Sequence, residues 1–370
     1  MTAPSGTRSE AERSIRAIQK TLISKGFQTP EELERFLNEH LVAKPLDELA
    51  AMIEEEEPQT DLDRAEQLMD ELPAEATPAE VRRTAKAALK LSEECLGAWL
   101  VLGVHEEKAA KALVWFDQGI EKGRARFADL IDSLDAEYGM WGWIEARDFM
   151  RLLHQRAIVL EELGKLDQAV TAYQEMLTLN PGDNQGVRDD LLLLLMIFRR
   201  LEDGRALLDR FPKDTMPAMA YGRALLSFVE TMDRTGFELP DMETPGTPQT
   251  PSAVMKRLGP EFDMAKKHLK QAVKLNPFVP WMMTHPQIMG VNIAEMVMFG
   301  GPYEAASYAQ KWALIWYASV LPFFGMTAAM QADPMRHAKS KCIVEELQDV
   351  LGELESLGDM PWWKQFELGA

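Results

Sequence analysis

Apolar side chains recur at spacings of three and four along most of the chain, which is the period of a helix with one buried face. An early example begins at residues 29–32, where threonine, proline and two glutamates form the start of a helix with a capping box. Leu33, Phe36, Leu37 and Leu41 then follow on one face. Similar patterns continue toward the C-terminus, so the sequence predicts an all-α protein.

Between Met150 and Pro181 the apolar pattern takes a more specific form. Helix-pair repeats of about 34 residues need small and large side chains at set places so that adjacent helices interlock. Counting back from Pro181, these places hold Leu153, Ala157, Leu160, Gly164, Ala169, Tyr173 and Met176. This spacing predicts one tetratricopeptide repeat (TPR), with Gly164 in the turn between its two helices.

Weaker copies of the pattern flank this repeat. They comprise Trp99, Leu102 and Gly103 with Ala112, Phe116 and Gly119, a helix pair over 187–199 and 201–211, and Ala265, Leu269, Ala272 and Pro277. We therefore predict a TPR-like helix-pair solenoid with an N-terminal helical extension and C-terminal capping helices. The expected parts are an acidic helical segment over 1–62, the array over 63–234, a Pro-, Gly- and Thr-rich loop over 235–260, and a final repeat with C-terminal helices over 261–370.

Short strings within the array also resemble a known family. They are Ala87, Leu89, Leu91 and Ser92; Gly142, 145–147, Met150 and Arg151; 176–177, 179–181 and 183–186; and 275–277, 279–280, 304–305 and Tyr308. On these residues the stretch from about Asp63 to Trp316 resembles uncharacterised bacterial-type TPR proteins that are similar to the suppressor-of-tumorigenicity-7 family. The resemblance implies a helical array with no established catalytic residues.

The net charge of the chain restricts the classes of molecule that we expect it to bind. The 370 residues include 40 basic and 59 acidic side chains, a formal net charge of −19. Such a chain repels phosphate backbones, and we identify no local basic cluster in the sequence that offsets this charge, so we expect no nucleic-acid partner. A protein partner with a basic segment suits the charge better. The two cysteines, Cys95 and Cys342, form no CxxC pair, and the N-terminus lacks an apolar signal core, so we expect a cytoplasmic protein.

Catalytic and metal-binding motifs are not apparent. The six histidines stand alone in sequence, and His105-Glu106-Glu107 lacks the second histidine of a zinc-protease motif because position 109 is Ala. There is neither a phosphate-binding glycine loop nor a Gly-x-Ser-x-Gly elbow. We therefore expect no enzyme activity, no metal and no cofactor.

Binding to a protein is the better expectation, because stacked helix pairs present a continuous concave surface. The first helix of each repeat lines that surface, which in the clear repeat points to Arg151, His154, Ile158, Glu161 and Glu162. TPR domains that capture chaperone tails hold a carboxylate with lysine and asparagine on this helix. Here His154 and Ile158 take those places, so we expect no such clamp.

Residues 137–151 concentrate aromatic side chains near arginines. Trp141, Trp143 and Phe149 lie close in sequence to Arg147 and Arg151. An aromatic plug between repeats is the favoured interpretation, and a binding hot spot is the alternative. Because the two arginines are four residues apart on one helical face, they could hold an acidic group together.

Two C-terminal features remain open. Residues 312–330 carry no charged side chain, but Pro322 and Gly325 interrupt them, so we favour a buried helix pair over a membrane span. The aromatic tail with Trp362, Trp363 and Phe366 could cap the solenoid or dock on a partner.

The leading functional hypothesis is a non-catalytic scaffold that binds another protein or peptide along its first helices. One alternative is a structural subunit that stabilises a larger assembly or enzyme. Another is a membrane-associated protein anchored near 312–330.

Overall fold

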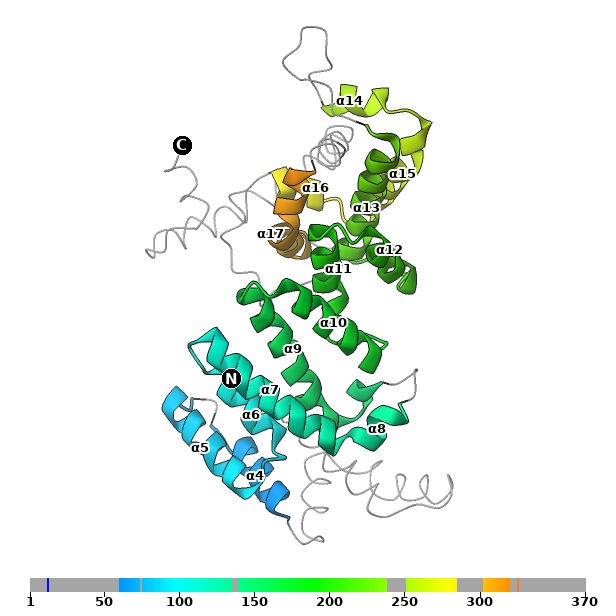
Figure 1. The fold of residues 1–370 in the computed structure, drawn as a ribbon. Coiled ribbons are helices and arrows are strands. Elements are labelled where there is room, and N and C mark those ends of the chain that lie inside the picture. Colours follow the sequence, from blue (N-terminus) through cyan, green and yellow to red (C-terminus); the bar gives the residue numbers. More distant parts are fainter. Residues whose placement is uncertain are drawn as a thin grey trace, which may run out of the picture. The chain divides into compact units, whose positions relative to one another are not determined.

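The computed structural model describes Glu12, residues 60–73, 75–134, 139–237, 251–284, 302–319 and Gly325. All secondary structure in these ranges is helical (Figure 1), which confirms the predicted all-α class. The chain divides into two compact units, residues 1–188 and 189–370, and each is described by itself. The part boundaries expected from the sequence remain a prediction.

The first unit is a succession of helix pairs. Its described helices are α4 (Asp61–Asp70), α5 (Pro78–Leu91), α6 (Leu96–Val104), α7 (Ala109–Arg126), α8 (Ala128–Asp132), η1 (Met140–Gly142), η2 (Ile144–Ala146), α9 (Arg147–Glu162) and α10 (Leu166–Leu179). Within pairs, α4 packs on α5, α6 on α7 and α9 on α10, while α5 contacts α6 and α7 contacts α9 across successive pairs. Each pair thus buries the face that its neighbour leaves open.

Polar caps set the beginnings of the first two helices. The Thr60 side chain accepts a hydrogen bond from the Asp63 amide, and the Asp63 carboxylate accepts one from the Thr60 amide. Thr77 and Glu80 form the same capping box at α5, with Pro78 at its first position. A cap of this kind stabilises a helix by about 1 kcal/mol.

Small residues allow the helices of this unit to approach closely. Gly103 of α6 lies against the ring of Phe116 in α7, and Gly123 of α7 lies against Phe149 in α9. The side chains assigned to packing positions in the clear repeat are buried: Leu153, Ala157, Leu160, Ala169, Tyr173 and Met176. Gly164 adopts a left-handed φ of 67° in the turn between α9 and α10, as the repeat pattern predicts.

The string at residues 183–186 forms a turn that starts the next helix. Asp183 accepts hydrogen bonds from the amides of Val187 and Arg188, at 2.9 and 3.0 Å, and pairs with the Arg188 guanidinium at 2.8 Å. Gln185 donates from its side chain to the carbonyl of Met150, 3.2 Å away. This motif therefore has a structural role, because it caps one helix and ties the turn to α9.

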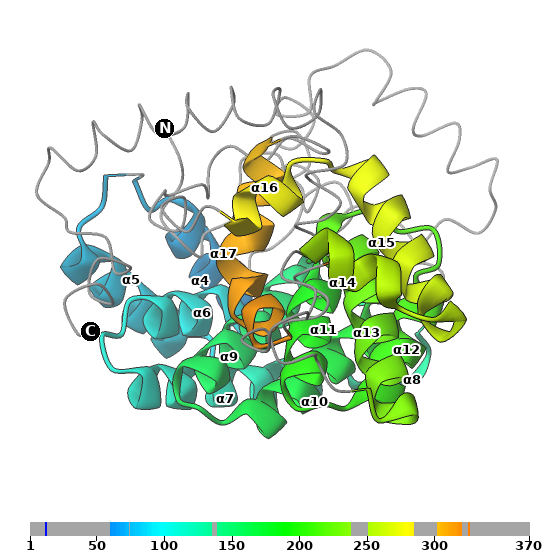
Figure 2. The same ribbon diagram turned by 90° about the horizontal axis from the view of Figure 1, so that it is seen from above.

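The second unit continues the helical architecture. It holds α11 (Val187–Ile197, which begins at the end of the first unit), α12 (Leu201–Arg210), α13 (Pro217–Thr235), α14 (Pro251–Arg257), η3 (Pro260–Phe262), α15 (Asp263–Leu275), α16 (Val279–Thr284) and α17 (Pro302–Ala318). Helices α11 and α12 confirm the pair expected over 187–211. Helices α13 and α15 lie side by side (Figure 2), and Ala265, Leu269 and Ala272 are buried as predicted.

The apolar stretch that begins at Trp312 is partly described. Trp312, Ala313 and Trp316 of α17 are buried within the second unit, while Leu314 is exposed. None of the described helices combines the length and apolar character needed to cross a membrane. Most of residues 320–330 lie outside the described ranges, as do residues 238–250 of the expected loop.

Candidate protein-binding site

Four of the predicted binding residues, Trp141, Trp143, Arg147 and Arg151, lie at or just before the beginning of α9. Trp141 belongs to η1, Trp143 lies between η1 and η2, and both short helices pack against α9. Arg147 and Arg151 lie one turn apart in the first five residues of α9. The positive end of the helix dipole disfavours cations at this place, so the two arginines need compensating negative charge.

Two arginines lie over one indole ring. The guanidinium carbons of Arg147 and Arg151 are 5.1 and 5.8 Å from the centre of the Trp141 ring, within the range of cation–π attraction. Arg147 also donates from Nε to the carbonyl of Trp141 at 3.1 Å. Arg151 donates from Nη1 to the buried carboxylate of Asp148 at 2.9 Å. Each guanidinium is therefore oriented by a neighbour within residues 141–151.

A carboxylate from the N-terminal part of the chain lies between these arginines. Oε1 of Glu12 accepts a hydrogen bond from Nη1 of Arg147 at 3.1 Å and from Nη2 of Arg151 at 2.5 Å. The side chain of Glu12 is only 13% exposed. The expectation that the arginine pair holds an acidic group is thus met by a residue of the same chain.

The remaining candidates follow along α9. Ile158 is 40% exposed and Glu162 is also exposed, so both are accessible to a ligand. His154 is half-buried with its ring edge-on to Tyr173, at 6.4 Å between ring centres. The Tyr173 hydroxyl donates to Glu161, which is therefore held against α10.

The aromatic residues of this segment have different environments. Phe149 is fully buried, as a plug between repeats requires. Trp143 is 43% exposed, and Trp141 lies beneath the arginines rather than in the core. The plug interpretation therefore applies to Phe149 and is wrong for Trp143, whereas Trp141 is half-buried under the arginines. The short helices η1 and η2 interrupt the helical periodicity, which leaves the Trp143 indole at the surface.

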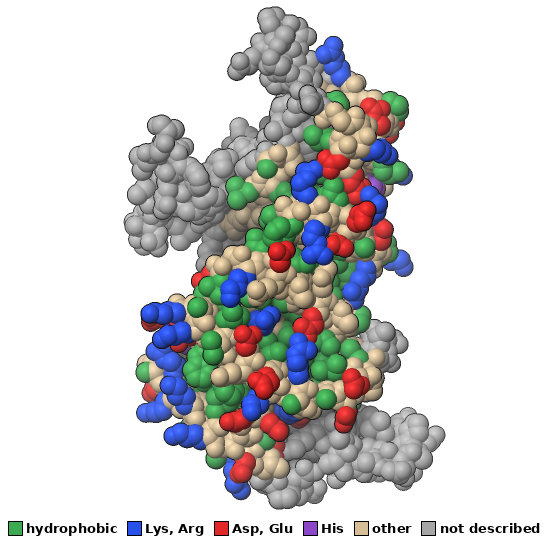
Figure 3. All heavy atoms as spheres, in the orientation of Figure 1, with side chains coloured by type: hydrophobic (Ala, Val, Ile, Leu, Met, Phe, Trp, Pro, Cys, Tyr) green, Lys and Arg blue, Asp and Glu red, His purple; other side chains and the backbone are tan. Residues whose placement is uncertain are grey.

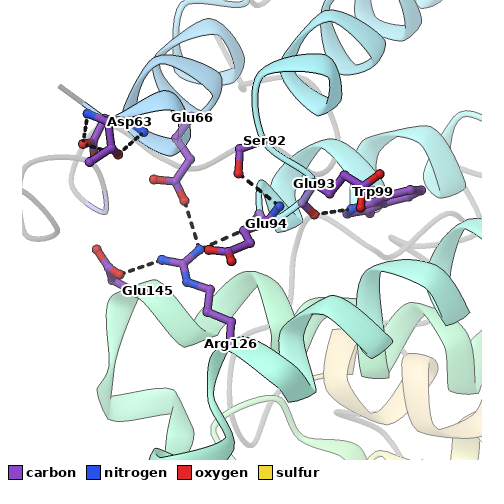
Figure 4. Close-up of polar contacts among 9 residues, drawn as sticks. Asp63, Glu66, Ser92, Glu93, Glu94, Trp99, Arg126 and Glu145 are labelled. Carbon is purple, nitrogen blue, oxygen red and sulfur yellow. Dashed lines mark hydrogen bonds and ion pairs between the residues drawn. The ribbon is translucent and has the colours of Figure 1, made fainter.

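Glu145, which is close in sequence to the arginine pair, serves a different cation. Arg126 donates to Glu145 at 2.8 Å, to Glu66 at 3.4 Å and to the carbonyl of Glu94 at 3.3 Å (Figure 4). This network connects α4, the turn before α6, α7 and η2. It fixes the short helix that precedes α9 and therefore supports the position of Arg147.

The sequence analysis also did not predict a basic surface on α5, which is formed by four Arg and Lys side chains. Arg82, Arg83, Lys86 and Lys90 line one hollow of this helix, and no ion pair joins the last three to a carboxylate of a described residue. Lys and Arg side chains gather at the lower left of Figure 3, over α5. The expectation that no basic cluster offsets the net charge of −19 remains a prediction. The 82-83-86-90 spacing places these side chains on one helical face, so a helical projection would have revealed them. The contact of Glu12 with Arg147 has no comparable signal in the sequence, because the two residues are 135 positions apart.

Candidate metal-binding clusters and the C-terminal aromatic residues complete the set of sites considered from the sequence. No group of three or more His, Cys, Asp or Glu in them is arranged to hold a metal ion. The aromatic tail residues Trp362, Trp363 and Phe366 lie outside the described residues, so their role remains a prediction.

Comparison with known proteins supports the repeat assignment. Residues 151–183 match the family model described as Tetratricopeptide repeat. No curated protein and no solved structure matches the chain. The chain therefore contains a repeat of the tetratricopeptide type, and the resemblance to the suppressor-of-tumorigenicity-7 family remains a prediction.

Proposed function

We propose that this protein is a non-catalytic TPR scaffold that binds another protein through the exposed face of α9 and the adjoining Trp141–Trp143 segment. Repeats of this type generally mediate protein–protein interaction, which agrees with the match at residues 151–183. The binding face includes Trp141, Trp143, Arg147, Arg151 and the accessible Ile158 and Glu162 further along the helix.

The observation that carries this proposal is the carboxylate held by Arg147 and Arg151. Each hydrogen bond between charged groups contributes roughly 1.5–3 kcal/mol, and the oriented guanidiniums lose little freedom when they bind. Aromatic and arginine side chains together are also typical of the residues that dominate binding energy at interfaces. The face therefore provides an acid-binding point beside an exposed indole and an exposed aliphatic side chain.

Charge defines the partner further. A chain of net charge −19 attracts a segment that is basic on average, whereas the arginine pair accepts one acidic side chain. We propose a protein segment that combines both features, and a cytoplasmic location in which such a partner is met. A phosphate-rich nucleic acid does not fit this combination, because it carries many negative charges and no positive ones.

The test is affinity capture from native lysate of the source cells with the full-length chain as bait. The Arg147→Gln/Arg151→Gln variant should lose the specific partner, since at least about a tenfold affinity loss is expected when both charged donors are removed. The Arg83→Gln/Lys86→Gln variant removes the same charge from α5 and should retain it. Circular dichroism confirms that each variant is folded.

A partner that both variants retain would contradict the proposed site. If that partner also forms a stable stoichiometric assembly with the chain, the structural-subunit hypothesis takes precedence. Dependence of solubility on detergent would instead favour membrane association.

A further inference from the structure

Contacts other than those of Glu12 orient both guanidinium groups of the arginine site. Arg147 is oriented by the carbonyl and ring of Trp141, and Arg151 is oriented by Asp148. All of these orienting groups lie within residues 141–151. Glu12 adds a carboxylate to guanidinium groups that these neighbours already orient.

The sequence around Glu12 has the character expected of a partner segment. Residues 5–20 contain Glu10 and Glu12 among four basic side chains, Arg8, Arg13, Arg16 and Lys20. The segment is thus basic overall and presents an acidic side chain to the arginine pair. This is the same combination that the net charge and the arginine pair require of an external ligand.

We propose that Glu12 is an internal ligand: it occupies the Arg147–Arg151 site and must be displaced when the partner binds. This inference rests on the proposed function and adds its regulation. A ligand on the same chain acts at an effective concentration in the millimolar range when the segment that links it to its site is short. This effective concentration falls as the linking segment becomes longer. To displace Glu12, a partner segment therefore has to bind tightly or be present at high local concentration. Loss of the Glu12 charge lowers the affinity or concentration that the partner needs.

The experiment uses the full-length chain and a fluorescein-labelled peptide of residues 5–20, with binding followed by fluorescence anisotropy. The Glu12→Gln chain should bind the peptide about tenfold to a hundredfold more tightly than the wild-type chain, because its own occupant no longer carries a charge. The additional substitutions Arg147→Gln and Arg151→Gln should abolish that gain. Adding Arg83→Gln and Lys86→Gln instead should leave the gain intact.

A second peptide with Glu12→Gln separates site binding from general attraction. This peptide is more basic than the first, so an acidic protein would bind it at least as well if attraction were non-specific. Binding at the arginine pair predicts the opposite, a loss of about tenfold or more on the Glu12→Gln chain. Equal binding of both peptides, or equal binding by the wild-type and Glu12→Gln chains, would overturn the proposal.

The two proposals fail in distinguishable ways. If Glu12→Gln gives no gain while capture from lysate still depends on Arg147 and Arg151, the site binds a partner and Glu12 has only a structural role. If the peptide behaves as expected while the captured partner is indifferent to the arginines, the internal contact is real but the partner binds elsewhere.

Discussion

Arg126 of α7 pairs with Glu66 of α4 at a place that solvent hardly reaches. The closest atoms are 3.4 Å apart, and the two side chains are 12% and 2% exposed. Arg126 also lies over the ring of Phe127, 5.1 Å from its centre, and Glu145 and the carbonyl of Glu94 complete its surroundings (Figure 4). A buried ion pair of this kind makes the two partners strongly interdependent.

Removal of Arg126 should therefore destabilise the first unit substantially. Arg126→Leu removes the guanidinium that pairs with the buried Glu66 carboxylate, and breaking a buried ion pair in this way costs about 3–5 kcal/mol in the free energy of unfolding. Arg124→Ala, which breaks an exposed pair with Glu175, should cost less than about 1 kcal/mol. Chemical denaturation followed by circular dichroism measures both. Similar losses in the two variants would show that the Arg126 network is not coupled to stability.

Two helical glycines should respond to alanine in opposite directions. A β-carbon on Gly103 would lie 2.1 Å from Cε1 of Phe116, so Gly103→Ala forces α6 and α7 apart and should cost about 1–3 kcal/mol. A β-carbon on Gly204 in α12 would lie 3.7 Å from its nearest neighbour, an ordinary contact. Gly204→Ala should therefore stabilise the protein by up to about 1 kcal/mol through helix propensity. Thermal unfolding measures the stability of each variant relative to the wild-type chain. Stabilisation by both substitutions would refute the close approach of α6 and α7.

The two Asn-Pro motifs should differ in importance. Asn276 donates to the Glu304 carboxylate at 3.0 Å and accepts from the Phe278 amide at 3.2 Å, and both Asn276 and Glu304 are buried. Asn276→Ala should cost about 2–4 kcal/mol, because these groups lose hydrogen bonds away from water. The side-chain oxygen of Asn180 has no hydrogen-bond partner among the described residues, so Asn180→Ala should cost less than about 1 kcal/mol. Urea denaturation midpoints compare the two, and equal losses would contradict the assignment.

His268 should make stability depend on pH below neutrality. Burial lowers the pKa of His268 below the ordinary 6.5, and the positive charges of Arg223 and Lys267 lower it further. Its Nδ1 lies 2.7 Å from the Ser227 hydroxyl. The unfolded chain then takes up a proton more readily than the folded chain. The contribution of the neutral ring to stability is fully present above pH 6.5, decreases as the pH falls below that value, and is lost once the pH passes the folded-state pKa.

A His268→Gln variant isolates this effect. The difference in unfolding free energy between the wild-type and variant chains should shift in favour of the variant between pH 7.5 and pH 5. A difference that stays constant over this range would show that the folded-state pKa of His268 is unperturbed.

Local patterns determined the elements of the fold. The spacing of Leu153, Ala157 and Leu160 is enough to define a buried helical face, because residues three and four apart lie on one side of a helix. Gly164 likewise predicted the turn between α9 and α10, since only glycine adopts a left-handed φ without strain. These features depend on neighbours within a few residues, and so they could be recognised from the sequence.

The candidate site was determined by sequence only in part. Arg147 and Arg151 could be placed on one face because they are four residues apart, and their affinity for an acidic group follows from their charge. The exposure of Trp143 and the position of Trp141 beneath the arginines could not be predicted from the sequence, because η1 and η2 break the helical period on which such a prediction depends.

Only the tertiary structure brought distant charges together. Glu12 is 135 residues from Arg147, and Glu66 is 60 residues from Arg126. Among 59 acidic side chains, no feature of the sequence distinguishes these two from the others. Ion pairing acts through space at a few ångströms, whereas sequence patterns report neighbours along the chain. The helices and their packing faces can therefore be predicted from the sequence. The residue that binds the arginine pair is determined by the tertiary structure.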